Sequence, residues 1–219
     1  MARVLLLDIG NVLIKKEKNS LLNYIKNTVG LIAIKRQDEV KEILRTLEKG
    51  QLDFTDAVSN IADLLEHSFD IDNFKNMYNS QFMECYKNYE GYLRFLGKYG
   101  SFRLRIATNI SKEHWEHLRK RHDTKYITYL AGYKSYEMGI KKSNPKFFEH
   151  VIKKENVAPE NFLLIDNNMK YIQTARNFGM KAELFRYPLG VEILKGILNH
   201  HEFHDNITIG KKNQLANKS

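Results

Sequence analysis

The chain has 219 residues, of which 42% are hydrophobic, and it is long enough for one domain with a substantial insertion or for two small domains. Cys85 is its single cysteine, so an internal disulfide is excluded and we expect a cytoplasmic protein in a reducing compartment. No apolar run approaches the roughly 20 residues that a membrane-spanning helix needs, and we therefore expect no membrane partner.

The formal net charge of +9 is unevenly distributed along the chain. Residues 15–89 carry 11 basic and 12 acidic side chains, whereas residues 97–186 carry 18 basic and 9 acidic ones. A basic segment of this kind favours an anionic substrate or partner, although a lysine-rich solvated surface would give the same count. A nucleic-acid or protein partner stays open, but no zinc-finger spacing, RNA-binding motif or compact arginine cluster supports it.

The first predicted elements are one buried strand and a block of helices. Residues 3–9, RVLLLDI, form the nearly continuous apolar run that is typical of a strand buried on both faces. Apolar residues then recur at helical spacing, with Asp53 and Asp70 as predicted helix starts and Gly50 as a predicted stop. The segments with this spacing are residues 20–29, 39–50, 56–67 and 72–86. We therefore expect residues 15–89 to form a separate helical block.

Strands and helices alternate after this block. The predicted strands are residues 103–109, 125–131, 161–166 and 181–187, and the predicted helices are residues 111–121, 144–155, 168–179 and 189–199. Such alternation predicts an α/β fold with a doubly wound (Rossmann-like), mostly parallel sheet, built from residues 1–14 and 90–200. Residues 201–219 lack periodicity, and we expect them to form a flexible C-terminal tail.

Polar side chains follow the predicted strands where each strand ends. Asp8 follows the first apolar run, and further polar clusters follow at Thr108 and Asn109, at Lys141 and Lys142, and at Asp166, Asn167 and Asn168. Taken singly, each cluster could cap a turn or a helix or lie in solvent. Because the carboxyl ends of parallel strands meet at one edge of a sheet, together they predict a functional site there.

These clusters resemble the four motifs of the haloacid dehalogenase (HAD)-like hydrolases. LLLDIGNVL resembles the first motif, in the branch that has aspartate, any residue, glycine, asparagine and valine, and IATN resembles the second. GIKKSNPKFF resembles the third motif and FLLIDNNMKYIQTARNFGM the fourth, so that the resemblance covers residues 3–190. It implies that the helical block is a cap inserted after the first strand.

By this resemblance Asp8 would be a nucleophile that forms an aspartyl intermediate. Thr108 and Asn109 would hydrogen-bond the transferring group, and Lys142 would offset the negative charge collected beside Asp8.

The resemblance also implies a Mg²⁺ cofactor, held by Asp8, the carbonyl of Gly10 and the fourth motif with Asp166 and Asn167. The chain departs from the family pattern at three positions: Gly10 stands where many family phosphatases have a second aspartate, Asn167 replaces an acidic metal ligand, and Ser143 replaces a proline. An amide oxygen keeps a ligand but removes a charge, so weaker Mg²⁺ binding is expected.

The function expected from this pattern is that of a magnesium-dependent phosphatase, which hydrolyses a small phosphorylated metabolite through an aspartyl-phosphate at Asp8. A second interpretation is a catalytically degenerate HAD-like protein that binds a phosphorylated ligand or a macromolecular partner. A minor alternative is a haloacid dehalogenase, since attack of Asp8 on carbon needs no metal. The basic segment favours phosphate over a small haloacid.

Overall fold

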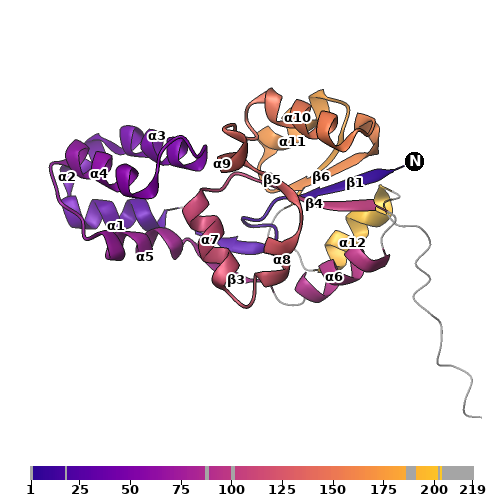
Figure 1. The fold of residues 1–219 in the computed structure, drawn as a ribbon, viewed down its shortest axis with the longest axis horizontal. Helices are drawn as coiled ribbons and strands as arrows, with labels where there is room; N and C mark the ends of the chain where they lie inside the picture. Colours follow the sequence, from indigo (N-terminus) through magenta and orange to yellow (C-terminus); the bar gives the residue numbers. More distant parts are fainter. Residues whose placement is uncertain are drawn as a thin grey trace, which may run out of the picture.

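A five-stranded parallel sheet forms the centre of the protein in the computed structural model, which describes residues 2–17, 19–86, 89–99, 102–185, 191–201 and 203 (Figure 1). Its strands, in the order β5-β4-β1-β6-β7, are β1 (Arg3–Leu7), β4 (Phe102–Thr108), β5 (Gly132–Lys134), β6 (Phe162–Asp166) and β7 (Lys181–Leu184). Leu7 of the central strand pairs with Ile106 of β4 and with Ile165 of β6. The predicted α/β fold with a mostly parallel sheet is confirmed.

Helices cover both faces of this sheet, as a doubly wound fold requires (Figure 1). Val4 and Leu6 pack on the face covered by α10 (Pro145–Glu155) and α11 (Met169–Asn177). Leu5 and Leu7 pack on the opposite face. That face is covered by α6 (Tyr89–Tyr99), α7 (Lys112–Lys120), α8 (Lys125–Tyr129) and α12 (Val191–His200). Because β1 is buried on both faces from Val4 to Leu7, these residues are all apolar.

The helical block has a hydrophobic core of its own, to which Ile25, Ile61 and Phe74 belong. Its helices are α1 (Ser20–Val29), α2 (Leu31–Lys35), α3 (Gln37–Glu48), α4 (Phe54–Leu65) and α5 (Ile71–Asn79). The Asp70 side chain accepts a hydrogen bond from the Asn73 amide at 2.8 Å and so caps α5 as predicted. In Figure 1 the block lies beside the sheet, close to the ends of the strands.

One predicted helix is wrong in its second half. Residues 72–86 were expected to be helical, but α5 ends at Asn79 and Phe82–Cys85 form a strand, β3. β3 pairs antiparallel with β2 (Ile14–Lys16), the segment that leads into the helical block. Pairing between the outgoing and the returning chain supplies backbone hydrogen bonds that a helical period cannot reveal. Helix α6, which begins at Tyr89, was not predicted.

The predicted strand at residues 125–131 is also wrong. Lys125–Tyr129 form the short helix α8, which buries Ile127, and the edge strand β5 begins only at Gly132. A Cβ atom at position 132 would lie 2.4 Å from the carbonyl oxygen of Ile106, so the close approach of β5 to β4 requires glycine there. β-Branched and aromatic side chains in residues 125–131 gave a strand signal that tertiary packing overrides.

The chain ends are described only in part. Residues 186–190, which fall in a predicted strand and helix, and most of the predicted tail lie outside the described residues. Phe203, at the start of the predicted tail, is fully buried with its ring 5.8 Å from that of Phe102. The remaining short elements are α9 (Ser135–Met138) and the 3-10 helix η1 (Pro159–Asn161). No helix in the described ranges combines the length and the apolar character needed to cross a membrane.

Candidate active site

Asp8 lies directly after β1, at the carboxyl edge of the sheet. Its backbone amide donates to the carbonyl of Ile165 at 3.0 Å, which extends the pairing with β6 by one residue. The following turn is closed by hydrogen bonds from the amides of Leu13 and Ile14 to the carbonyl of Ile9, both at 2.9 Å. Only 7% of Asp8 is exposed, so its carboxylate is held in a fixed position at the mouth of the sheet.

Lys142 joins Asp8 to the end of β6. Its Nζ donates to Asp8 Oδ1 at 2.6 Å, to Asp166 Oδ2 at 2.5 Å and to the carbonyl of Ala107 at 2.9 Å. Burial by itself would lower the pKa of Lys142, but the charges of Asp166 and Asp8 outweigh it and raise this pKa. Lys142 is therefore a buried ammonium group whose donors are all satisfied.

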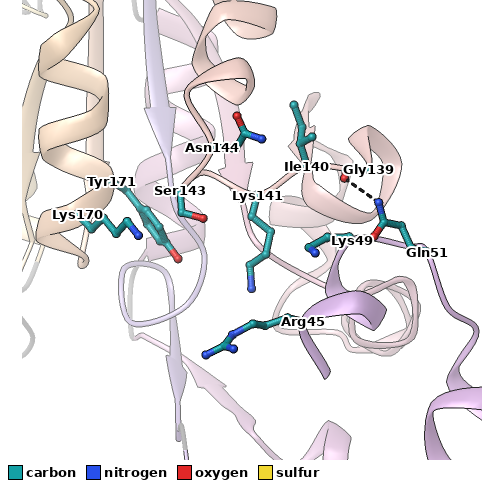
Figure 2. Close-up of a pocket in the computed structure, with 10 residues that line it drawn as sticks. All are labelled: Arg45, Lys49, Gln51, Gly139, Ile140, Lys141, Ser143, Asn144, Lys170 and Tyr171. Carbon is teal, nitrogen blue, oxygen red and sulfur yellow. Dashed lines mark hydrogen bonds between the residues drawn. The ribbon is translucent and has the colours of Figure 1, made fainter. Parts of the chain in front are cut away.

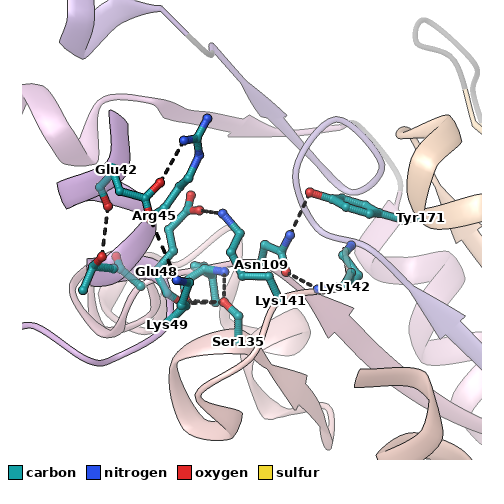
Figure 3. A network of polar contacts seen from close by, with 12 residues as sticks. Glu42, Arg45, Glu48, Lys49, Asn109, Ser135, Lys141, Lys142 and Tyr171 are labelled. Atoms are coloured by element: carbon teal, nitrogen blue, oxygen red, sulfur yellow. Dashed lines mark hydrogen bonds and ion pairs between the residues drawn. The ribbon is translucent and has the colours of Figure 1, made fainter. Parts of the chain in front are cut away.

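Asn109, at the end of β4, holds the neighbouring loops in place. Its Oδ1 accepts a hydrogen bond from the backbone amide of Lys142 at 2.9 Å, and its Nδ2 donates to the hydroxyl of Tyr171 at 2.9 Å (Figure 3). Thr108 is 2% exposed and lines the same cavity as Asp8. The structure thus brings Thr108 and Asn109 beside Asp8, while their contact with a transferring group stays a prediction.

Asp166 lies behind the cavity and does not line it. The residue is fully buried, and its Oδ1 accepts a hydrogen bond from the amide of Asn168 at 2.8 Å. Burial raises the pKa of Asp166, and the charge of Asp8 acts in the same direction against the opposing charge of Lys142. Asn167 and Asn168 line the cavity instead. Asp166 therefore acts on Asp8 through Lys142, whereas Asn167 lies in the cavity wall.

A cavity of about 140 Å³ collects these groups, and we call it the Asp8 cavity. Besides the predicted residues Asp8, Gly10, Thr108, Asn109, Lys142 and Asn167, its walls include Asn11, Lys16, Glu48, Phe82, Lys141, Asn168 and Tyr171. Sequence reasoning missed Glu48, Lys16 and Phe82 as site residues because they come from the helical block and its connecting strands, which no motif marks. Tyr171 could have been found, since it follows Asn168 by one helical turn.

The residues around Asp8 fit a magnesium ion. Two carboxylates, Asp8 and Asp166, share the single ammonium group of Lys142, which leaves one negative charge in a buried place. Asp8 offers a carboxylate oxygen, Gly10 a backbone carbonyl and Asn167 an amide oxygen, which are the hard ligands that Mg²⁺ prefers. Within the described part of the chain, no hydrogen bond occupies the Asn167 side chain.

Side chains that could bind a metal also lie close together outside the Asp8 cavity. Glu183, His200 and His201 bring a carboxylate oxygen and two ring nitrogens within 4.8 Å of one another. His201 Nε2 lies 2.8 Å from Glu183 Oε1, so this group ties the end of α12 to β7. It is separate from the Asp8 cavity.

A comparison with models of protein families shows which family the chain belongs to. The model of the haloacid dehalogenase-like hydrolases matches residues 2–179. The chain belongs to this HAD-like hydrolase family. The match includes all four polar clusters at the strand ends, so the resemblance of the motifs reflects membership of the family. The assignment to the branch defined by Gly10, Asn11 and Val12 stays a prediction.

Three proteins that are similar to this HAD-like hydrolase differ from it widely in sequence. Drimenol cyclase drtB from Aspergillus calidoustus is 25% identical over 189 residues, which are 84% of this chain but only 34% of that protein. A HAD family enzyme from Bacteroides thetaiotaomicron has a similar structure, with a TM-score of 0.78, 19% identity and coverage of 89% of this chain and 98% of that one. L-2-haloacid dehalogenase from Xanthobacter autotrophicus is less similar, with a TM-score of 0.56, 16% identity and coverage of 94% and 85%. At these identities the two structures support the fold alone.

Proposed function

We propose that this HAD-like hydrolase is a magnesium-dependent phosphatase that hydrolyses a small phosphorylated metabolite. The observation that carries the proposal is the contact between the nearly buried Asp8 carboxylate and the buried ammonium of Lys142, which also binds Asp166. An anionic nucleophile can approach an anionic phosphate only where cations screen both, and Lys142 supplies one such charge at the required place.

The reaction would proceed through Asp8. With Oδ1 held by Lys142, the other carboxylate oxygen is available to attack phosphorus, and the bond from phosphorus to the leaving oxygen breaks as the aspartyl-phosphate forms. Water then attacks phosphorus, releases inorganic phosphate and restores the carboxylate. Lys142 and Thr108 would stabilise the negative charge on the phosphoryl oxygens. Mg²⁺, held by Asp8, Gly10 and Asn167, would neutralise further charge on the phosphate when bound.

Protonation of the leaving group distinguishes this site from one with a second aspartate. Gly10 brings no acid to the position two residues after Asp8, and Glu48 is the carboxylate that lines the cavity from the helical block. Glu48 is held in an ion pair by Lys141 (Figure 3). Aryl phosphates, whose leaving groups depart without a proton, should therefore be better substrates than alkyl phosphates.

Magnesium and phosphate are compatible with the wider family. The Bacteroides thetaiotaomicron enzyme has also been crystallised in complex with magnesium and inorganic phosphate. The dehalogenase alternative is supported only by similarity of the fold. The haloacid dehalogenases are also less similar in structure to this chain than the Bacteroides thetaiotaomicron enzyme is. A catalytically degenerate binding protein is the outcome to be expected if Asn167 has removed too much charge from the metal site.

The test is release of phosphate from a generic aryl phosphate and from a panel of phosphorylated metabolites, with and without Mg²⁺. We expect metal-dependent turnover that Asp8→Asn abolishes, with circular dichroism showing that the variant is folded. Lys153→Gln, an exposed change on α10 away from the cavity, is the matched control and should behave like the wild type. Folded wild-type protein without turnover at any Mg²⁺ concentration would contradict the proposal and favour the binding protein.

A further inference from the structure

A second and larger cavity adjoins the Asp8 cavity, and we call it the basic cavity. Its volume is about 590 Å³, against about 140 Å³ for the Asp8 cavity. Lys141 and Tyr171 line both, so that a single ligand can extend from one into the other. A volume of this size is typical of small-molecule sites. The Asp8 cavity can hold the reacting phosphate, and the remainder of a substrate would then occupy the basic cavity.

Three parts of the chain contribute basic side chains to this cavity. Arg45 and Lys49 come from the end of α3, Lys141 from the loop before α10, and Lys170 from the first turn of α11. Figure 2 shows the charged ends of Arg45, Lys141 and Lys170 turned toward the space between α11 and the helical block. Among the residues that the structure describes, the ten that line the basic cavity include no acidic side chain.

Nearby carboxylates neutralise only part of this charge. Glu42 binds Arg45 at 2.9 Å and lies 4.0 Å from Lys49, and Glu48 pairs with Lys141 (Figure 3). The Arg45 hydrogen bond, together with the charges of Arg45, Lys49 and Lys141, lowers the pKa of Glu42.

The remaining cation of the cavity is Lys170. In the part of the chain that the structure describes, no ion pair involves Lys170. Four cations therefore face two carboxylates, and the excess positive charge lies where a ligand extending from Asp8 would end.

Neutral polar and apolar groups complete the walls. Gln51, whose Nε2 donates to the carbonyl of Gly139 at 3.5 Å, and Ser143 contribute polar atoms, while Ile140 and the ring of Tyr171 contribute apolar surface (Figure 2). Such a mixture suits a short carbon skeleton whose far end carries a charge. The limited volume of the cavity suits one small molecule and not a long polyanion.

We infer that the substrate carries a second anionic group, a carboxylate or a second phosphate, and that Arg45, Lys49 and Lys170 in the basic cavity bind it. This inference rests on the proposed phosphatase function, since it takes the first phosphate to lie at Asp8. It names the substrate class as phosphomonoesters of small acids or bisphosphates. Phosphomonoesters with an uncharged far end would lack this contact and should be poorer substrates.

The experiment compares kcat/KM of the full chain across three matched series: alkanediol monophosphates, the corresponding bisphosphates, and phosphoryloxy carboxylic acids, each with increasing chain length. We expect a preference for the two doubly anionic series at one chain length. In the variant Arg45→Gln/Lys170→Gln the ratio of doubly anionic to neutral-ended kcat/KM should fall about tenfold, from the loss of two charged contacts of which each is worth about threefold. Lys153→Gln should keep the wild-type ratio.

The outcomes separate the two proposals. Turnover without any preference for a second anionic group, or an unchanged ratio in the double variant, would overturn the inference while leaving the phosphatase intact. Bisphosphates preferred over phosphoryloxy carboxylic acids would assign the second group as phosphate, and the reverse would assign it as carboxylate. If no phosphomonoester is hydrolysed, calorimetric binding of phosphono-carboxylic acids against alkylphosphonates tests the basic cavity alone. Tighter binding of the former, lost in the double variant, would support the cavity, and equal binding would overturn it.

Discussion

The adjacent lysines 141 and 142 allow the electrostatics of the site to be tested by one matched pair of substitutions. Lys142→Met removes a buried ammonium that binds Asp8 and Asp166 and replaces it by a side chain of similar size. Each charge-assisted hydrogen bond contributes about 1.5 to 3 kcal/mol, and breaking a buried ion pair costs about 3 to 5 kcal/mol. We therefore expect the free energy of unfolding to fall by about 4 kcal/mol, a large share of the stability of an ordinary domain.

Lys141→Met is the control for this prediction. Lys141 contacts one carboxylate, Glu48, and both side chains are partly solvated, at 16% and 22% exposure, so the loss should be at most about 1 kcal/mol. The assay is urea unfolding of both variants with a chelator present, so that no bound metal replaces the lost charge. Equal losses in the two variants, or a loss below about 1 kcal/mol for Lys142→Met, would refute the assignment of Lys142 as the charge that holds the two carboxylates together.

Two further predictions concern metal affinity and pH. Asn167→Asp restores a carboxylate beside Asp8, and an enzyme that is merely weakened in metal binding should then reach half-maximal activity at a lower Mg²⁺ concentration; an unchanged magnesium titration would contradict the placement of Asn167. Burial lowers the pKa of His114 well below its ordinary value of 6.5, with Lys16 adding to the effect, so the neutral form is favoured in the folded state. Its stabilising contribution is present above the unfolded pKa and is lost as pH falls below it, by about 1.4 kcal/mol per pH unit. Urea unfolding between neutral and acidic pH should show this slope, and it should flatten in His114→Phe; an equal slope in both proteins would assign the pH dependence to other groups.

Most of the central sheet could be predicted from the sequence, since its determinants are local. The apolar run from Val4 to Leu7 and its counterpart in β6 are buried on both faces, and this requirement leaves a direct trace in composition. The starts of the helices predicted at residues 111–121 and 144–155 are also correct, because the Ser111 cap and Pro145 each act within their own helical turn. Thr108, Asn109 and Asn167 beside Asp8 were predicted from their places at strand ends, where the topology brings them to one edge.

The tertiary structure alone decided which side chains of the helical block reach the site and how the charges balance. Glu48 enters the Asp8 cavity and Arg45 the basic cavity because the end of α3 lies against α9, where the Ser135 hydroxyl donates to the carbonyl of Glu48 at 2.6 Å, and no local pattern in residues 37–48 records that position. The same holds for β3 and for the edge strand at Gly132, whose pairing partners are distant in sequence. Asp166 was predicted as a metal ligand, yet burial and two hydrogen bonds place it behind Lys142, and such shielding arises only when the chain is packed. Periodicity and motifs thus determined the elements and the residues at their ends, whereas contacts between distant segments determined the shape and charge of the space in which those residues meet.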